Sequence, residues 1–181
     1  MPVRAPKQGE VEQLAAIVQD SDDAIVGKTL EGVVTNWNPA AERMYGYSSE
    51  EMIGRSIDLL SPKERVGEIK AILALIKAGE QVHHFETVRV RKDGTTFPAS
   101  ISISPIRNVD GSIAGASTIA RDITIQRQAF DAARSMIESS LDSLVAISPE
   151  GTITDANLAT VKVTGIPRDE LIGTAFSDYF T

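Results

Sequence analysis

The feature that most constrains the fold of this 181-residue chain is an internal repeat. Residues 140–181 align with residues 21–62 at a constant offset of 119, and the alignment needs no gaps. Twelve of these 42 positions are identical. The period is that of whole domains in tandem, because solenoid units recur every ~20 to 50 residues. We therefore expect one complete domain and the first part of a second copy, within a fragment of a longer protein.

The hydrophobic pattern of the first copy predicts two strands, several helices and then three more strands. Apolar residues alternate with polar ones in the last three segments, and Asp-Gly pairs separate them as hairpin turns. Strands joined mainly by hairpins form an antiparallel sheet with the helices gathered on one side. The sequence thus predicts an α+β fold. The expected strands cover residues 24–29, 33–37, 82–91, 96–107 and 113–123, and the longest helix covers residues 61–78.

The chain divides into four predicted segments. They are an N-terminal flanking helix (1–20), a complete domain (21–125), a helical linker (126–140) and a truncated second domain (141–181). The flanking helix carries apolar residues with helical spacing, which predicts a buried or dimerising face. These are Val11, Leu14, Ala15 and Val18.

The linker carries apolar residues every seven positions, at Ile123, Phe130, Ile137 and Leu144. Such a heptad spacing is typical of a coiled-coil seam. We expect this helix to pair with the same helix of a second chain, with Phe130 and Ile137 in the contact. The chain is accordingly predicted to form a homodimer.

Composition excludes several classes of function. The net charge of −7 and the pI of about 4.9 argue against binding to nucleic acid or anionic lipid. No apolar run is long enough to span a membrane, and the first 20 residues do not resemble a signal peptide. The absence of cysteine removes disulfides and thiolate metal sites and suits a reducing compartment. We expect a cytoplasmic protein without nucleic-acid or membrane partners.

No set of residues predicts catalysis. Neither histidine lies near the strand serines in the sequence, and no strained G-x-S-x-G turn or phosphate-binding glycine loop occurs. The acidic pair Glu50-Glu51 falls in the first turn of a helix, where acids offset the helix dipole. We expect no enzyme activity in this chain.

Three motifs at their observed spacings resemble the PAS family over residues 21–125 and, in part, 140–181. They are Asn36-Trp37-Asn38-Pro39-Ala40-Ala41 followed by Tyr45-Gly46-Tyr47-Ser48 and Ile53-Gly54, then Arg91-Lys92-Asp93-Gly94-Thr95 before Phe97-Pro98, and finally Arg121-Asp122-Ile123-Thr124. The resemblance implies the PAS fold, a five-stranded antiparallel sheet with helices on one face around a small pocket. It also implies a sensory module of a two-component or similar system, upstream of an output domain such as a histidine kinase or cyclase.

The resemblance suggests which residues serve these roles. A packed core is the favoured interpretation of the pocket, and a small-molecule site is the alternative. Its candidate lining is Met44, Ile53, Ile57, Leu60, Ile69, Leu73, Phe97, Ile101 and Ile119. The motif Asp122, Ile123 and Thr124 is expected to relay signals from the last strand to the linker helix, whereas the alternative for Asp122 is a simple helix cap.

Cofactors are not expected. Ile57 stands where a light-sensing flavin domain resembling this one carries cysteine, and Arg89, Ala99 and Ala120 stand where such domains carry flavin-binding amides. No histidine lies in the long helix, where an oxygen sensor would carry its haem ligand. His83 and His84 remain as candidates for a displaced haem site. A sensor of a small molecule, haem or flavin is therefore the alternative to a signal-relay module without a cofactor.

Overall fold

The computed structural model describes residues 8–65 and 67–179 of the chain. Contacts between residues divide the protein into two compact units, Met1–Thr124 and Ile125–Thr181. Among the described residues, no helix is both long and apolar enough to cross a membrane.

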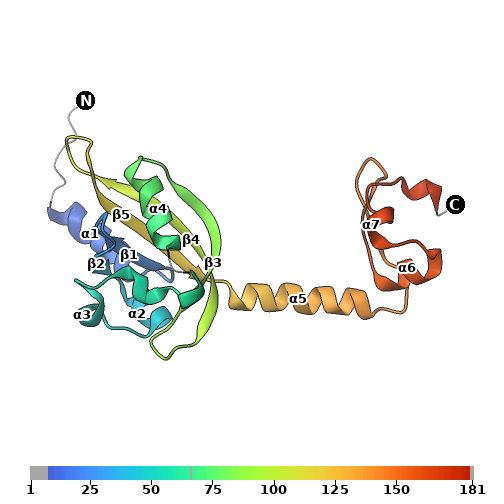
Figure 1. The fold of residues 1–181 in the computed structure, drawn as a ribbon, viewed down its shortest axis with the longest axis horizontal. Coiled ribbons are helices and arrows are strands. Elements are labelled where there is room, and N and C mark those ends of the chain that lie inside the picture. Colours follow the sequence, from blue (N-terminus) through green and yellow to red (C-terminus); the bar gives the residue numbers. More distant parts are fainter. Residues whose placement is uncertain (1–7, 66, 180–181) are drawn as a thin grey trace. The chain divides into compact units, whose positions relative to one another are not determined.

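The first unit is built on a five-stranded antiparallel sheet with the strand order β2-β1-β5-β4-β3 (Figure 1). This arrangement confirms the predicted α+β fold and the PAS-like sheet. The strands are β1 (Ala24–Lys28), β2 (Val34–Trp37), β3 (Val82–Val90), β4 (Thr96–Arg107) and β5 (Ile113–Asp122). Strand β5 lies at the centre, so the last strand of the unit pairs with the first, β1, and with β4.

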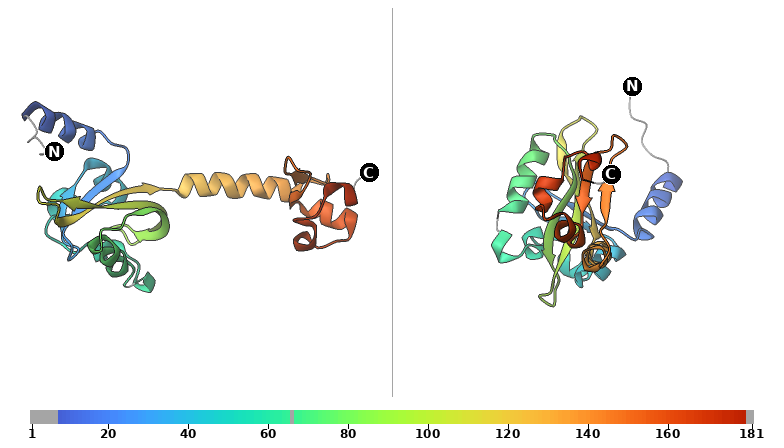
Figure 2. Two further views of the ribbon diagram at one scale, coloured as in Figure 1. Left: turned by 90° about the horizontal axis from the view of Figure 1, so that it is seen from above. Right: turned by 90° about the vertical axis from the view of Figure 1, so that its right-hand side faces the viewer.

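The helical segments of the first unit connect β2 to β3 and cover one face of the sheet (Figure 1). They are α2 (Pro39–Tyr45), α3 (Ser49–Met52), η1 (Ile57–Leu60), η2 (Lys63–Arg65) and α4 (Glu68–Lys77). Helix α1 (Gln8–Gln19) lies on the opposite side of the sheet from α4, as both views in Figure 2 show.

Helix α4 is shorter than the sequence predicted. The expected helix over residues 61–78 is interrupted at Gly67, whose φ of 95° lies in the left-handed region. An α-helix cannot continue through such a residue, so η2 precedes Gly67 and α4 follows it. The apolar stripe survives in α4, where Ile69, Ile72 and Ile76 are buried, whereas Val66 lies outside the described residues.

The core lies between the helices and the sheet. Alternate residues of β4 point toward it, which is why Phe97, Ala99, Ile101 and Ile103 are buried while the serines between them are half-exposed. A cluster of aromatic rings occupies one end of this core. Tyr45 packs against Trp37 and Phe97, with ring centroids 5.4 and 5.6 Å apart.

The second unit repeats the start of the first. It contains β6 (Val145–Ile147), β7 (Ile153–Ala156), α6 (Leu158–Thr164), α7 (Arg168–Leu171) and η3 (Phe176–Asp178). The isolated bridge between Thr152 and Ala175 corresponds to the bridge between Val33 and Ser56, with both residues shifted by 119. The internal repeat is thus a structural repeat, and the second unit has the form of a partial copy.

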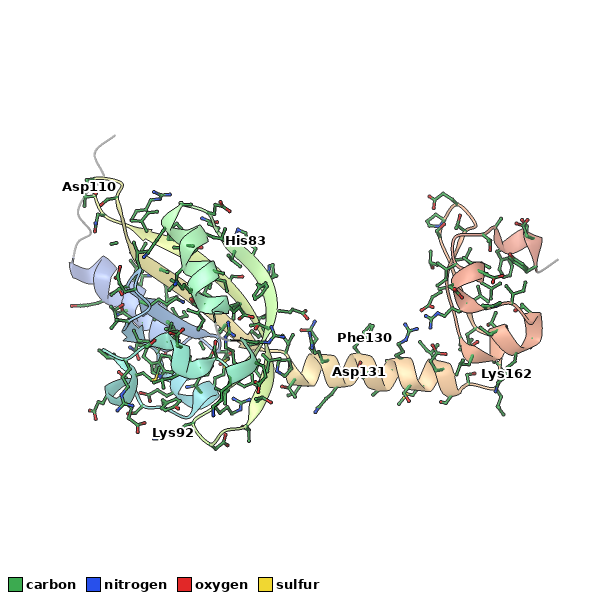
Figure 3. The ribbon with its side chains drawn as sticks, viewed as in Figure 1. His83, Lys92, Asp110, Phe130, Asp131 and Lys162 are labelled. Atoms are coloured by element: carbon green, nitrogen blue, oxygen red, sulfur yellow. The ribbon has the colours of Figure 1, made fainter. Side chains whose placement is uncertain are left out.

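Helix α5 (Thr124–Ser139) follows directly after β5 and covers most of the predicted linker. Phe130 is 66% exposed and projects outward from the helix (Figure 3), and Ile137 is 49% exposed. Ile123 does not share this surface. It is buried in the first unit, where its backbone N–H extends the pairing of β5 with β4 by donating to the carbonyl of Pro98. The expected seam therefore lacks its first member.

Candidate functional site

A small cavity lies between the helices and the sheet of the first unit. Its volume is about 30 Å³, which exceeds the roughly 10 to 15 Å³ that a cavity needs to hold one water molecule. Most of its wall is apolar, but three buried polar side chains from three different strands also reach it, namely Lys28, Arg89 and Thr118. The remaining lining residues are Val26, Tyr45, Ile57, Leu60, Ile69, Ile72, Leu73, Ile101 and Ile103.

Lys28 is the last residue of β1 and is only 4% exposed. Its ammonium group donates a hydrogen bond to the hydroxyl of Thr118 on the neighbouring strand β5. Burial, and next the nearby charge of Arg89, lowers the pKa of Lys28 to about 8. The lysine thus remains mainly protonated at neutral pH, although its surroundings favour the neutral form.

Arg89 lies on β3 and is equally buried, but it has a carboxylate partner. Its Nη1 lies 2.8 Å from Oε1 of Glu68 at the start of α4. Glu68 also accepts hydrogen bonds from Arg65 and from the hydroxyl of Thr87. Burial disfavours the ionised form of Glu68, but these hydrogen bonds outweigh it and hold its pKa below the usual value. The Glu68 carboxylate is therefore fully engaged away from Lys28.

The structure brings five of the nine predicted pocket residues together on the cavity wall, namely Ile57, Leu60, Ile69, Leu73 and Ile101. Phe97 is buried in the adjacent core, and Met44 is partly buried against it. These placements do not test whether the residues bind a ligand, which stays a prediction.

The predictions for Ile53 and Ile119 are wrong, because both side chains are about half exposed and neither lines the cavity. Ile119 lies on β5 between the inward-facing Thr118 and Ala120, so the alternation of a strand turns it to the outer face. Ile53 ends the single turn of α3, which buries Met52 instead. Seven of the twelve lining residues lie outside the predicted set, and among them are the polar residues Lys28, Arg89 and Thr118.

His83 and His84 do not approach the cavity. Both are exposed, and they occupy an irregular part of β3 where the pairing register shifts between Val82 and Phe85. His83 is labelled at the edge of the sheet in Figure 3. Within residues 8–65 and 67–179, no group of three or more His, Asp or Glu side chains could hold a metal ion. A haem held in the cavity by either histidine does not fit this geometry.

Asp122 lies at the junction between the last strand and α5, and its two carboxylate oxygens have different partners. Oδ1 accepts a hydrogen bond of 2.8 Å from the backbone N–H of Thr124, the first residue of the helix. Oδ2 lies 2.6 Å from Nη2 of Arg91, which follows β3. Burial disfavours the ionised form, but interactions with Thr124 and Arg91 outweigh it and lower the pKa of Asp122. Asp122 is thus both a helix cap and a partner in an ion pair.

A continuous series of contacts connects the cavity with this junction. Tyr45 lines the cavity and packs against Phe97. The guanidinium of Arg91 lies over the Phe97 ring, 3.9 Å from its centre. Arg91 also donates to the carbonyl of Met44 and pairs with Asp122. A displacement of Tyr45 would therefore meet packed neighbours at each step toward Thr124.

The predicted dimer residues of α1 lie on an open surface. Leu14 is 59% exposed and Val18 is 36% exposed, and Ala15 is also exposed. Ile17, which lies outside the predicted set, is 61% exposed. The side chain of Val11 lies outside the described residues.

Comparison with known proteins places both units in one family. A family model described as a PAS domain matches residues 22–124, and a second model, described as the PAS fold, matches residues 132–181. The chain is also similar to curated sensory proteins. It is 26% identical to the sensor protein FixL of Bradyrhizobium diazoefficiens over 147 residues, covering 79% of this chain and 28% of FixL.

Two other relatives show the same partial coverage. The chain is 23% identical to a phytochrome of Picea abies over 89% of its own length and 15% of the phytochrome. It is 27% identical to the histidine kinase AtoS of Escherichia coli over 62% of its own length and 18% of AtoS. The chain therefore spans less than a third of the length of each of these relatives.

Solved structures share the fold of the first unit. A PAS domain from Colwellia psychrerythraea superposes with a TM-score of 0.59 and is 28% identical, covering 64% of this chain and 98% of that domain. An RNA-binding light-oxygen-voltage receptor superposes with a TM-score of 0.61 at 24% identity, covering 75% of this chain and 41% of the receptor.

Proposed function

Because this chain belongs to the PAS domain family, we propose that it is a sensory and signal-relay module that acts on the output domain of a longer protein. The relatives FixL and AtoS are a sensor protein and a histidine kinase, and the chain matches only a part of each. Regulation of a signalling enzyme, such as a histidine kinase, is therefore the role we assign to it.

The observation that carries this proposal is the double contact of Asp122. Its carboxylate pairs with Arg91 on one side and caps the first residue of α5 on the other. A change that moves Arg91 must alter its hydrogen bond to Asp122 or move Asp122, which caps α5. The start of α5 is thereby coupled to the packing of Phe97 and Tyr45, and through them to the cavity.

The relay is tested in the full-length protein that contains this chain. Asp122→Ala removes both contacts and should change the resting activity of the output domain or abolish its response. Glu64→Ala, which removes an exposed carboxylate of η2, serves as the matched control and should leave both unchanged. An Asp122→Ala protein that folds and keeps the normal resting activity and response would contradict the relay.

Homodimerisation through α1 and α5 is the second part of the proposal. Exposed apolar side chains on both helices support it, since large apolar residues such as Leu14 and Phe130 gain from burial in an interface.

Light scattering should give the mass of a dimer for the chain. Double substitution of Phe130 and Ile137 by serine should weaken the dimer at least about tenfold, and Val109→Ser on an exposed turn should not. A monomeric wild-type chain at tens of micromolar would refute this part.

We also propose that the domain operates without haem or flavin. Sites for such ligands have volumes of roughly 300 to 1,000 Å³, whereas this cavity holds about 30 Å³. An absorption spectrum of the purified protein across the near-ultraviolet and visible range tests the point. We expect no band, and a Soret band or flavin peaks in a purified sample would overturn the proposal.

A further inference from the structure

The cavity of the first unit contains a positive charge, that of Lys28, which forms no ion pair with a carboxylate of residues 8–65 or 67–179. Lys28 is almost completely buried, and it lines the cavity. Among the described residues its only hydrogen-bond partner is the Thr118 hydroxyl, although an ammonium group can donate three hydrogen bonds. Buried ammonium groups are normally paired, so the remaining donors of Lys28 indicate a missing partner.

Arg89 adds a second cation to the same wall. Within the described part of the chain, its guanidinium bonds through Nη1, which contacts Glu68, Thr87 and the carbonyl of Val88. The guanidinium therefore retains donors on its other nitrogens. Glu68 does not line the cavity, and it already accepts from Arg89, Arg65 and Thr87. No acidic side chain among the lining residues balances the two cations.

Tyr45 supplies a further polar group to the wall. Its hydroxyl has no hydrogen-bond partner among the described residues, and burial raises its pKa to about 12, so it remains a neutral O–H donor. The cavity wall thus combines one ammonium, one guanidinium and two hydroxyl groups with an otherwise apolar lining. This set of donors is complementary to an acceptor with negative charge.

We propose that this cavity is a binding site for a small anion, such as formate, acetate, nitrate or chloride, which is held between Lys28, Arg89, Thr118 and Tyr45. The volume of about 30 Å³ limits the ligand to a few non-hydrogen atoms. The apolar residues Ile57, Leu60 and Ile69 of the covering helices exclude water from the ion pair and so strengthen it.

Residues 140–179, which the structure describes, include no equivalent set of polar side chains in the second unit. Ile147 occupies the position equivalent to Lys28, at the offset of 119, and is 43% exposed. The aligned residues 140–181 correspond to residues 21–62 and so do not include the positions of Arg89 and Thr118. Any stoichiometric binding that depends on Lys28 is therefore assigned to the first unit alone.

This inference rests on the sensory role proposed above and deepens it, because the anion would contact Tyr45 at the start of the route to Asp122. Binding itself does not require the relay. Anion binding without any change in output from the full-length protein would leave the site intact and would refute only its role in signalling. Conversely, loss of output in Asp122→Ala would support the relay whether or not an anion binds.

The test measures thermal stability of the chain at constant ionic strength. Sodium formate, acetate, nitrate and chloride each replace sodium gluconate, whose anion is too large for the cavity. We expect at least one anion to raise the Tm saturably, by about 5 °C or more at concentrations far above its Kd. Calorimetry with that anion should then give one site per chain. Equal Tm values in all five salts would overturn the proposal.

Two variants assign the effect to its residue. Lys28→Met keeps the length of the side chain without the charge, and it should lose the response to the anion. Lys63→Met removes an exposed lysine of η2 and should keep the full response. A Lys28→Met protein that folds and still responds like the wild type would overturn the proposal.

A pH series on the wild-type chain provides a test that does not depend on a variant. Lys28 has a pKa of about 8, and the groups facing it are Arg89 from β3, Tyr45 from α2 and, through Arg89, Glu68 from α4. The pKa of Glu68 is lowered and that of Tyr45 is raised to about 12, so neither of these two groups changes its charge between about pH 7 and 9.5, whereas Lys28 does. Affinity for the anion should fall roughly 30-fold over this range as the ammonium loses its proton. An affinity that does not change with pH would contradict the site.

Discussion

Asn38 and Asn157 lie 119 residues apart and make the same four hydrogen bonds. Oδ1 of Asn38 accepts from the backbone N–H groups of Ile25 and Ala41, at 2.9 and 3.0 Å. Its Nδ2 donates to the carbonyls of Val18 and Asp23, at 3.0 and 3.1 Å. All bonding positions of a buried amide are thereby used on three neighbouring segments.

Each partner of Asn157 is shifted from that of Asn38 by the length of the repeat. Its Oδ1 accepts from the N–H groups of Leu144 and Thr160, and its Nδ2 donates to the carbonyls of Ile137 and Asp142. In both copies the asparagine therefore ties the last turn of the preceding helix, α1 or α5, to the first strand and to the following helix.

Replacement of Asn38 by aspartate tests this connection. The carboxylate cannot donate to Val18 and Asp23, so two partly buried carbonyls lose their partners and the unfolding free energy should fall by about 2 kcal/mol. Hydrogen exchange should become faster in residues 14–20 at the end of α1. The same change at Asn157 should speed exchange at the end of α5 and leave α1 unaffected.

A matched control is available at Asn108, whose Nδ2 donates only to the hydroxyl of the exposed Ser112 among the residues that the structure describes. Asn108→Asp should change the unfolding free energy by less than about 0.5 kcal/mol. If Asn38→Asp lowered the unfolding free energy as little as Asn108→Asp, the hydrogen bonds by which Asn38 joins α1 to the domain would be unimportant for stability.

Asp122→Asn isolates the ion pair with Arg91, because the amide oxygen can still accept from Thr124. The variant should be less stable than the wild type by about 1 kcal/mol at pH 7, since both partners are only partly exposed.

The pKa of Asp122 is lowered in the folded state, so its stabilisation is present above the ordinary carboxyl pKa and is lost as the pH falls through the lowered value. Urea unfolding should show the two proteins converging at acid pH. A constant difference down to about pH 2 would argue against the ion pair.

Lys28 also predicts that stability rises with pH, but in a more alkaline range than Asp122. Its pKa is about 8 in the folded protein and ordinary in the unfolded chain, so the unfolded state binds more protons between these values. Stability should therefore rise as the pH increases from 7 to 9.5, with about 2 kcal/mol from this group. The measurement is urea unfolding at both pH values without added small anions. Lys28→Met should lack this contribution, and an equal rise in both proteins would assign it to other groups.

Gly115 provides a test of the packing between β1 and β5 beside the cavity. A Cβ at this position would lie 2.5 Å from the backbone carbonyl oxygen of Lys28, which cannot move without displacing the strand. Gly115→Ala should lower the unfolding free energy by about 2 kcal/mol or more. Gly9→Ala, with no atom within 4 Å of the added methyl group, should be neutral or stabilising in helix α1. Equal thermal stability of the two variants would contradict this packing.

The sequence was sufficient to predict the sheet and the repeat because both depend on local patterns. Alternating residues and Asp-Gly turns determine β3, β4 and β5, and Asn38-Pro39 determines the start of α2. Helix α4 was predicted too long because Gly67 was read as one more helical residue. The helix is interrupted at Gly67 because the backbone of this residue is left-handed, and that conformation depends on the packing around it.

The polar wall of the cavity was harder to predict. Lys28 follows Ala24 and Val26 at alternate positions of β1, so its inward orientation was readable from the sequence, but lysine is rarely buried and the pattern was not extended to it. Arg89 and Thr118 meet Lys28 through the pairing of strands that are far apart in the sequence. Such proximity follows from the topology of the sheet and not from any local motif.

The substitution of Ile147 for Lys28 in the second copy has an evolutionary consequence. The same asparagine joins helix and domain in both copies, whereas the equivalent position on the first strand carries Lys28 in one copy and Ile147 in the other. Selection can therefore alter what the interior of one copy recognises without disturbing how that copy is joined to its neighbour.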